Sequence, residues 1–240
     1  MKSDELPEKP LYPMRINKYL AHMGHATRRG ADELITRRKI TINGTLAVLG
    51  SKVNQGDVVK MVNAKGAPKL NYFAYHKPLG IIRSKNSEKE PDILLPRELE
   101  GMVPVGDLDK NAHGLVILTN DGRITERLRN PATKPEEEYM VRVKDKLRSS
   151  FRTKMAAGVE IEGFTTKPQP VTILSENSFV VALKEEKNNQ IRRMCVALFQ
   201  EVADLKRTRI GNITLAGLKP EEHRIIEGEE LTKFLKGLGL

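Results

Sequence analysis

Residues 114–119 read GLVILT, a nearly continuous apolar run between polar neighbours. Such a run is typical of a β-strand that is covered on both faces, so other elements must pack above and below it. Alternation of polar and apolar residues predicts further strands, and apolar residues at helical spacing predict helices. The predicted strands lie at 72–76, 139–143, 159–161, 171–173, 178–183, 202–205 and 208–215, and the predicted helices at 147–157, 190–199 and 229–238. Strands outnumber helices and do not alternate with them regularly, which predicts an α+β fold with a largely antiparallel mixed sheet flanked by helices.

The first part of the chain has a different pattern. Residues 14–21 place apolar side chains at helical spacing, and Thr27 is a suitable N-cap for a second short helix. Asn43-Gly44 lies between short alternating segments, which is a strong signal for a hairpin turn. We therefore expect a leader at 1–13, a small domain of two helices and short strands at 14–62, a linker at 63–70 and a larger domain at 71–240.

Positive charge is concentrated in the small domain. The chain of 240 residues has a formal net charge of +10, and residues 14–60 hold nine basic and three acidic side chains. A cluster of this kind favours a polyanionic partner, and structured RNA is the partner we expect. The basic residues that we expect to contact RNA in this domain are Arg15, Lys18, Arg28, Arg29, Arg37, Arg38 and Lys39.

Several other classes of protein are excluded or disfavoured. Cys195 is the only cysteine, so neither an internal disulfide nor a cysteine cage for a metal can form, and a cytoplasmic location is expected. His22 and His25 lack a third ligand nearby, so we expect no metal. Glycine-rich nucleotide-binding motifs are absent, and we expect no cofactor. No segment has the length and hydropathy of a membrane span, and nothing in the sequence signals an oligomer, so a monomer without a membrane partner is expected.

Two segments could support chemistry. Asp109 lies on an irregular loop between apolar strands, with Gly106 before it and Gly114 after it. Catalytic groups are often found on loops that a rigid sheet holds in place. Arg192 and Arg193 lie near the start of a predicted helix, where cations oppose the helix dipole and are better suited to binding an external anion or a carboxylate. The alternative is that Asp109 caps a turn and that the two arginines are solvated.

The motifs along the chain resemble a known family. The small domain resembles the S4 RNA-binding domain in 15–21 (RINKYLA), Gly24, 27–29 (TRR), Ala31 and 40–44 (ITING). The larger domain is similar to RsuA-type pseudouridine synthases, and most similar to their RluF branch, in 77–80 (KPLG), 106–109 (GDLD), 114–122 (GLVILTNDG), 138–139 (EY), 190–194 (QIRRM) and 205–211 (LKRTRIG). These motifs occur in the order of the family and cover nearly the whole chain.

The resemblance implies an activity and roles for particular residues. It implies isomerisation of a specific uridine to pseudouridine, without metal or cofactor. The expected substrate is ribosomal RNA, in the first place that of the large subunit, with transfer RNA as an additional substrate. Asp109 matches the essential aspartate, Tyr139 the aromatic residue that stacks on the target base, and Arg192 the cation that pairs with the aspartate. Arg193 and Arg207 lie in the same motifs, and we expect both to contact RNA.

The chain departs from the family pattern in the active-site motifs. Asp107 stands where an arginine is usual, Ala112 where a threonine or serine is usual, and Glu137 where a lysine is common. Lys110 or His113 could supply the missing positive charge near Asp109. The departures leave open an S4-containing RNA-binding or ribosome-assembly protein with weakened catalysis, but the presence of Asp109, Tyr139 and Arg192 favours an active enzyme.

Overall fold

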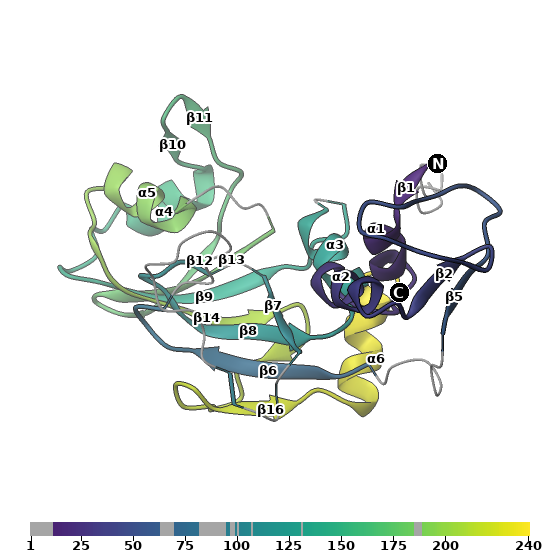
Figure 1. Ribbon diagram of the computed structural model, residues 1–240. Helices are drawn as coiled ribbons and strands as arrows, with labels where there is room; N and C mark the ends of the chain where they lie inside the picture. The colour runs from purple at the N-terminus through teal and green to yellow at the C-terminus, as the bar shows by residue number, and fades with distance from the viewer. Residues whose placement is uncertain are drawn as a thin grey trace. The chain divides into compact units, whose positions relative to one another are not determined.

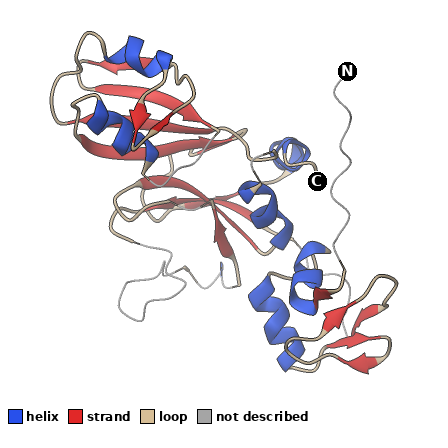
Figure 2. Cartoon of the chain, turned by 90° about the horizontal axis from the view of Figure 1, so that it is seen from above, coloured by secondary structure: helices blue, strands red, loops and turns tan. Residues whose placement is uncertain are grey.

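The computed structural model describes residues 12–62, 70–81, 95–96, 99, 101–106, 108–130, 132–184 and 189–240. Most of the predicted leader and linker, and Asp107, lie outside these residues. The chain divides into two compact units: residues 1–70 with Asn120–Arg123, and residues 71–119 with 124–240. We call them the N-terminal unit and the C-terminal unit, and Figures 1 and 2 show their elements. None of the described helices is long and apolar enough to cross a membrane.

The N-terminal unit contains two short helices and short strands. Thr27 caps the second helix, since its hydroxyl oxygen accepts from the backbone N–H of Gly30 at 3.1 Å. Asn43 and Gly44 both have positive φ and close the predicted hairpin. The elements are β1 (Met14–Arg15), α1 (Ile16–His22), α2 (Arg28–Thr36), β2 (Ile40–Ile42), β3 (Thr45–Leu46), β4 (Lys52–Val53) and β5 (Val59–Met61). Strand β1 pairs with β4, and β3, β2 and β5 form an antiparallel sheet in that order.

The C-terminal unit is built on one large sheet. In the described residues it has nine strands, with seven in the order β12-β13-β9-β14-β8-β6-β16, β7 pairing with β8, and β15 pairing with β14. All of these pairs are antiparallel except β14 with β8. The strands are β6 (Tyr72–Lys77), β7 (Val103–Val105), β8 (His113–Thr119), β9 (Glu137–Val143), β12 (Val171–Ser175), β13 (Ser178–Leu183), β14 (Val202–Ile210), β15 (Ile213–Thr214) and β16 (His223–Ile225), with the separate hairpin β10 (Glu160–Ile161) and β11 (Phe164–Thr165). The helices are α3 (Gly122–Arg129), α4 (Phe151–Ala157), α5 (Gln190–Ala197) and α6 (Gly228–Gly237).

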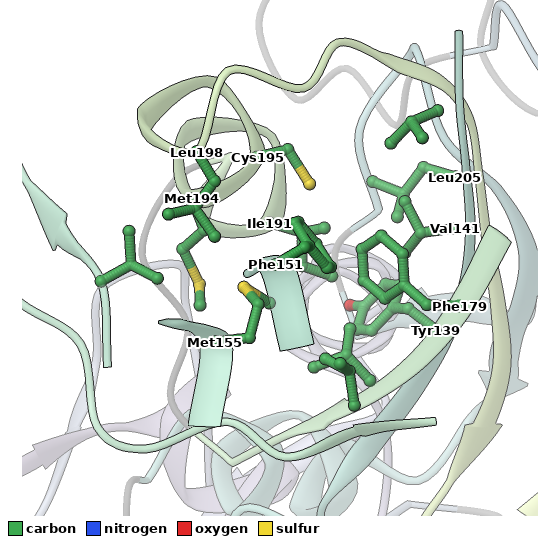
Figure 3. Packing of buried hydrophobic residues seen from close by; sticks show 14 of the residues in the cluster. Tyr139, Val141, Phe151, Met155, Phe179, Ile191, Met194, Cys195, Leu198 and Leu205 are labelled. Carbon is green, nitrogen blue, oxygen red and sulfur yellow. The ribbon is translucent and has the colours of Figure 1, made fainter. Parts of the chain in front are cut away.

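A large apolar core lies where α4 and α5 cover β9 and β13. Figure 3 shows Phe151 and Met155 from α4 packed with Ile191 and Met194 from α5 and with Phe179 from β13. Each of these side chains is at most 5% exposed, so the core holds the start of α5 firmly against the sheet. Cys195 is buried in the same cluster, and burial raises the pKa of its thiol to about 12, which makes it a poor nucleophile.

The predicted α+β class is confirmed, and so are the central strand, the two N-terminal helices and the buried face of α5. The prediction of one strand at 202–205 and a second at 208–215 places the break between the two strands wrongly. Strand β14 runs unbroken from Val202 to Ile210, with register irregularities against β9 between Val202 and Asp204 and between Arg207 and Arg209. A β-bulge interrupts the alternation of side chains without ending the strand, so the pattern suggests a break that is absent.

Candidate active site

The loop from Asp109 to Ala112 leads into the central strand β8, and every one of its backbone carbonyls is hydrogen-bonded. The Asp109 carbonyl accepts from the N–H of Ala112 at 3.1 Å, which closes a tight turn. The Lys110 carbonyl accepts from the N–H of Gly80 at 2.9 Å, and the Asn111 carbonyl from the Arg192 guanidinium at 2.6 Å. The loop is therefore fixed through its main chain, and it holds the exposed Asp109 side chain in place.

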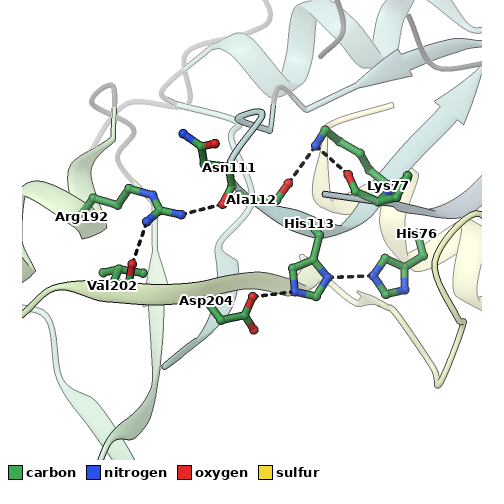
Figure 4. A network of polar contacts seen from close by, with 9 residues as sticks. His76, Lys77, Asn111, Ala112, His113, Arg192, Val202 and Asp204 are labelled. Carbon is green, nitrogen blue, oxygen red and sulfur yellow. Dashed lines mark hydrogen bonds and ion pairs between the residues drawn. The ribbon is translucent and has the colours of Figure 1, made fainter. Parts of the chain in front are cut away.

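Lys77, the last residue of β6, provides much of this support. Its ammonium donates to the carbonyls of Pro78, Asp109 and Ala112 at 3.1, 3.0 and 2.8 Å. Figure 4 shows the Lys77 side chain reaching the carbonyl of Ala112. The residue is 1% exposed. Burial and the neighbouring Arg207 lower the pKa of the Lys77 ammonium to about 8, although the charge of Asp109 acts in the opposite direction.

Arg207 holds the two ends of the same segment. Its guanidinium donates from Nη2 to the carbonyl of Gly106 and from Nε to the carbonyl of Leu115, both at 2.8 Å. The third interaction is an ion pair of 3.1 Å between Nη1 and Glu137. Arg207 is fully buried, so the expectation that it contacts RNA is wrong in this structure. The reason is topological, because β14 lies in the middle of the sheet and directs this side chain into the interior.

Glu137 is the acidic centre of a buried polar cluster. Besides Arg207, it accepts from the Tyr139 hydroxyl at 2.7 Å and lies 3.6 Å from the Lys134 ammonium. Burial alone would raise the pKa of the Glu137 carboxyl, but Arg207, Lys134 and Tyr139 together lower it. Burial and the adjacent Glu137 raise the pKa of the Tyr139 hydroxyl, against the influence of Arg207. Tyr139 is therefore neutral and fixed in orientation by an ionised carboxylate.

Tyr139 and the Asp109 loop share one packing environment. Tyr139 is 8% exposed, and it belongs to the same apolar cluster as Ala112, with Leu108 packed against that cluster. These two loop residues flank Asp109 in the sequence. The end of the loop and the tyrosine therefore belong to one apolar cluster, and the joint action of Asp109 and Tyr139 in one site remains a prediction.

Arg192 supports the loop without forming the expected ion pair. Its guanidinium donates to the carbonyls of Asn111 and Val202 at 2.6 and 3.2 Å, and Figure 4 shows it between these two segments. Within the described part of the chain, no ion pair joins Arg192 to Asp109. Arg193 forms an ion pair with Glu162 at the surface. The pairing of Arg192 with Asp109 remains a prediction for the complex with RNA.

The Asp109 carboxylate has the chemistry of an acid, base or nucleophile. Asp109 places an exposed carboxylate on a rigid loop. Among the described residues, no group of three or more histidine, cysteine, aspartate or glutamate side chains could hold a metal ion. A positioned carboxylate can accept a proton or attack an electrophilic carbon without any further group.

In the N-terminal unit, the basic residues predicted to contact RNA lie at the surface. Six of the seven side chains are exposed and Lys39 is half-buried. Asp32, one of the few acidic residues there, accepts a hydrogen bond of 2.9 Å from Asn17. This surface suits phosphate groups, since counterions released from RNA contribute to affinity.

Comparison with known proteins adds the family. Residues 71–197 match the model of RNA pseudouridylate synthases, and residues 14–59 match the model of the S4 domain. The chain belongs to the RNA pseudouridylate synthase family. It is a pseudouridine synthase, an isomerase, of the RsuA/RluB type with an N-terminal S4 domain.

Individual relatives agree with this family over nearly the whole chain. The dual-specificity RNA pseudouridine synthase RluF of Escherichia coli K12 is 34% identical over 93% of this chain and 79% of its own. The ribosomal large subunit pseudouridine synthase B of Bacillus subtilis is 30% identical over 92% of this chain and 95% of its own. A crystal structure of a pseudouridylate synthase has a TM-score of 0.68 and 27% identity, and the match covers 92% of this chain and 99% of that one.

The sequence reasoning missed several residues that build the site. In the sequence, Lys77 stands out only as part of the motif at 77–80. Glu137 stands out only as a departure from the family pattern. The network of His76, His113 and Asp204 was not noticed at all. His113 Nε2 lies 3.2 Å from a carboxylate oxygen of Asp204, a contact that the sequence does not predict. Only the pairing of β6, β8 and β14 brings these residues together, and the sequence does not show that pairing.

Proposed function

We propose that this pseudouridine synthase isomerises a specific uridine in ribosomal RNA, with large-subunit RNA as the first substrate class and transfer RNA as the second. The names of the E. coli and B. subtilis relatives support RNA, and in the second case the large ribosomal subunit, as the substrate. The observation that carries the catalytic part is the exposed Asp109 carboxylate on a loop whose four backbone carbonyls are all hydrogen-bonded.

The reaction needs little more than a positioned carboxylate. The bond between N1 of uracil and C1′ of ribose breaks, the uracil rotates, and a bond from C5 to C1′ replaces it while C5 loses its hydrogen to N1 or to water. No atom is gained or lost overall and no redox change occurs. Asp109 acts as the nucleophile or as the base in this sequence.

Arg192 and Tyr139 complete the proposed site. The Arg192 guanidinium is already bound to the loop carbonyl of Asn111, and we expect it to pair with the Asp109 carboxylate when RNA is bound. Tyr139 offers a ring whose hydroxyl is fixed by Glu137 before RNA binds. Extruding the target base from its stack costs about a few kcal/mol, and stacking on an aromatic ring returns roughly 1–3 kcal/mol.

The N-terminal unit would provide most of the binding to RNA. We propose that Arg15, Lys18, Arg28, Arg29, Arg37, Arg38 and Lys39 bind phosphate groups of structured RNA, and that Arg193 contributes a contact from the catalytic unit. Contacts of this type set affinity and register but do not specify a base. The choice of the target uridine would then depend on the shape of the RNA.

The test uses Asp109→Asn and Asp109→Ala, with Asp145→Asn as a control that removes a negative charge from an exposed turn. Release of tritium from RNA labelled at C5 of uracil measures turnover, and filter binding measures affinity. We expect both Asp109 variants to lose turnover while affinity stays within about threefold of wild type. Turnover that persists in both variants would refute the role of Asp109. Mapping pseudouridine in cells with and without this chain identifies whether ribosomal or transfer RNA is modified.

A further inference from the structure

Two histidines and an aspartate form a chain of hydrogen bonds next to the loop from Asp109 to Ala112. His76 Nδ1 lies 2.7 Å from the carbonyl oxygen of Leu218, and His76 Nε2 lies 3.1 Å from His113 Nδ1. His113 Nε2 lies 3.2 Å from a carboxylate oxygen of Asp204. The two rings are nearly parallel, with centroids 5.4 Å apart. Figure 4 shows the unbroken sequence of contacts from His76 through His113 to Asp204.

The partners at the two ends decide how many protons the rings hold. A carbonyl oxygen only accepts, so His76 Nδ1 must carry a hydrogen. An ionised carboxylate also only accepts, so His113 Nε2 must carry one. The contact between the rings needs one further hydrogen. Three ring hydrogens on two imidazoles amount to one positive charge, because two neutral rings hold only two.

The surroundings of His113 suit the additional hydrogen better than those of His76. His76 is 2% exposed, and burial lowers the pKa of its ring; His113 and Lys206 act in the same direction, while the hydrogen bond to Leu218 and the charge of Glu222 act in the opposite one. His113 is more exposed, with 19% of its side chain accessible, and it faces the Asp204 carboxylate. A charge-assisted bond to a carboxylate is about twice as strong as a neutral one. The charged and titratable residues on the elements next to the two rings are Lys77, Asp204, Lys206, Lys219, Glu221, Glu222 and His223.

The histidine chain is connected to the catalytic loop at two adjacent points. His113 follows Ala112, the last residue of the loop, and His76 precedes Lys77. Lys77 binds the Ala112 carbonyl while His76 binds the ring of His113, so neighbouring residues of β6 hold neighbouring residues at the start of β8. If the third hydrogen is lost, one of the two contacts of His113 fails: either two ring nitrogens without hydrogens face each other at about 3 Å, or an unprotonated Nε2 faces Asp204.

We propose that His113 is a positioning residue for the isomerisation: protonated and held between His76 and Asp204, it fixes the end of the loop that carries Asp109. The proposal rests on the proposed role of Asp109. A small displacement of a catalytic group can reduce turnover by up to about 100-fold, so loss of this proton lowers kcat. We expect the binding of RNA to be unaffected, because neither His76 nor His113 is among the residues proposed to contact RNA.

The first measurement is independent of activity. Nitrogen NMR of the full chain labelled with 15N-histidine reports which ring nitrogens are protonated. We expect the two rings to carry three hydrogens, two on His113 and one on Nδ1 of His76. Asp204→Asn keeps an oxygen that can accept but removes the negative charge, so the titration of His113 should move to lower pH. Two neutral rings across the pH range of activity would overturn the proposal, as would a titration unmoved by Asp204→Asn.

The second measurement connects this titration to turnover. In Asp204→Asn, the alkaline decline of kcat should move to lower pH by the same amount as the His113 titration, while KM for RNA stays unchanged. Asp145→Asn makes the same charge change on an exposed turn and should leave both profiles in place. His113→Asn and His113→Gln each retain one of the two hydrogen bonds, and each should lower kcat by about 10-fold or more.

The outcomes separate this proposal from the proposed function. A titration that moves while the kcat profile stays in place would show a structural role alone and overturn the positioning role. The pKa of Lys77 is lowered to about 8, so Lys77 can also contribute to the alkaline decline of kcat. That contribution should not change in Asp204→Asn. If the wild-type chain released no tritium from any RNA, the proposed function would fail, and the NMR result would still decide the protonation of His113.

Discussion

Replacing Glu137 with glutamine removes one negative charge from the interior of the C-terminal unit while nearly preserving volume. Arg207 is fully buried and cannot lose its proton, and Glu137 is the carboxylate with which it forms an ion pair. In the Glu137→Gln variant the guanidinium keeps its bonds to the carbonyls of Gly106 and Leu115. Its positive charge then lacks the Glu137 carboxylate at a site without access to water.

The expected cost follows from these contacts. Removing one partner of a buried ion pair costs about 3–5 kcal/mol. Glutamine retains one oxygen that can accept from Arg207 or from Tyr139, and a neutral hydrogen bond returns about 1 kcal/mol. We therefore expect a loss of about 2–4 kcal/mol in the free energy of unfolding of the C-terminal unit. For a unit of this size, that loss lowers the melting temperature by roughly 4–16 °C.

Differential scanning calorimetry and urea unfolding followed by circular dichroism measure this loss, which suits a chain that contains no tryptophan. Glu160→Gln, on the exposed side of β10, is the matched control and should change stability by less than about 0.5 kcal/mol. A loss below about 1 kcal/mol in Glu137→Gln would refute the assignment of a buried ion pair. The double variant Glu137→Leu/Arg207→Met should be more stable than either single variant, since both buried charges of the Arg207–Glu137 pair are then removed together.

The dependence on pH gives a second check. The pKa of Glu137 is lower in the folded chain than its ordinary value of 4.5. The stability that Glu137 contributes is therefore fully present above about pH 4.5 and is lost as the pH falls through the folded pKa. The difference between wild type and Glu137→Gln should narrow in acid, and a constant difference down to the acid transition contradicts the argument.

Three further predictions concern the loop and the RNA surface. Gly114→Ala should destabilise by about 3 kcal/mol, because an added Cβ would lie 2.3 Å from a backbone oxygen of β14; Gly163→Ala, also at positive φ but in open space, should cost less. Calorimetry of both variants distinguishes the clash from backbone strain. Arg28→Ala with Arg29→Ala should weaken binding to all structured RNAs alike and reduce the slope of log affinity against log salt by about 1.4–1.8, and an unchanged slope would contradict phosphate contact. The folded pKa of Lys77 is about 8 and its ordinary value 10.5, so the folded state binds fewer protons between these values. Urea unfolding should therefore show wild type gaining stability relative to Lys77→Met as the pH rises from 8 to 10.5, and equal changes in both would disprove it.

Local features of the fold could be predicted because their causes lie close together in the chain. Thr27 caps α2 through a residue three positions away, and Asn43-Gly44 forms its turn from its own backbone preferences. The buried stripe of α5 follows from helical spacing, and the structure buries Ile191 and Cys195 as expected.

The interior of the active site could not be predicted in the same way. Arg207 has the pattern of a surface cation, and only the pairing of β14 with β9 reveals that it faces Glu137. Arg192 was expected to bind the carboxylate of Asp109, but the structure directs it to the carbonyl of Asn111. A backbone carbonyl leaves no trace in the sequence, so a contact that uses one cannot be recognised from residue types.

The support of the catalytic loop by main-chain contacts has a consequence for how this enzyme can diversify. Lys77 and Arg192 hold the loop by carbonyl groups that every amino acid possesses. Exchanges of the side chains at Asn111 and Ala112 therefore leave these carbonyl contacts in place. The side chains next to Asp109 can therefore vary while the main-chain contacts that support its loop persist.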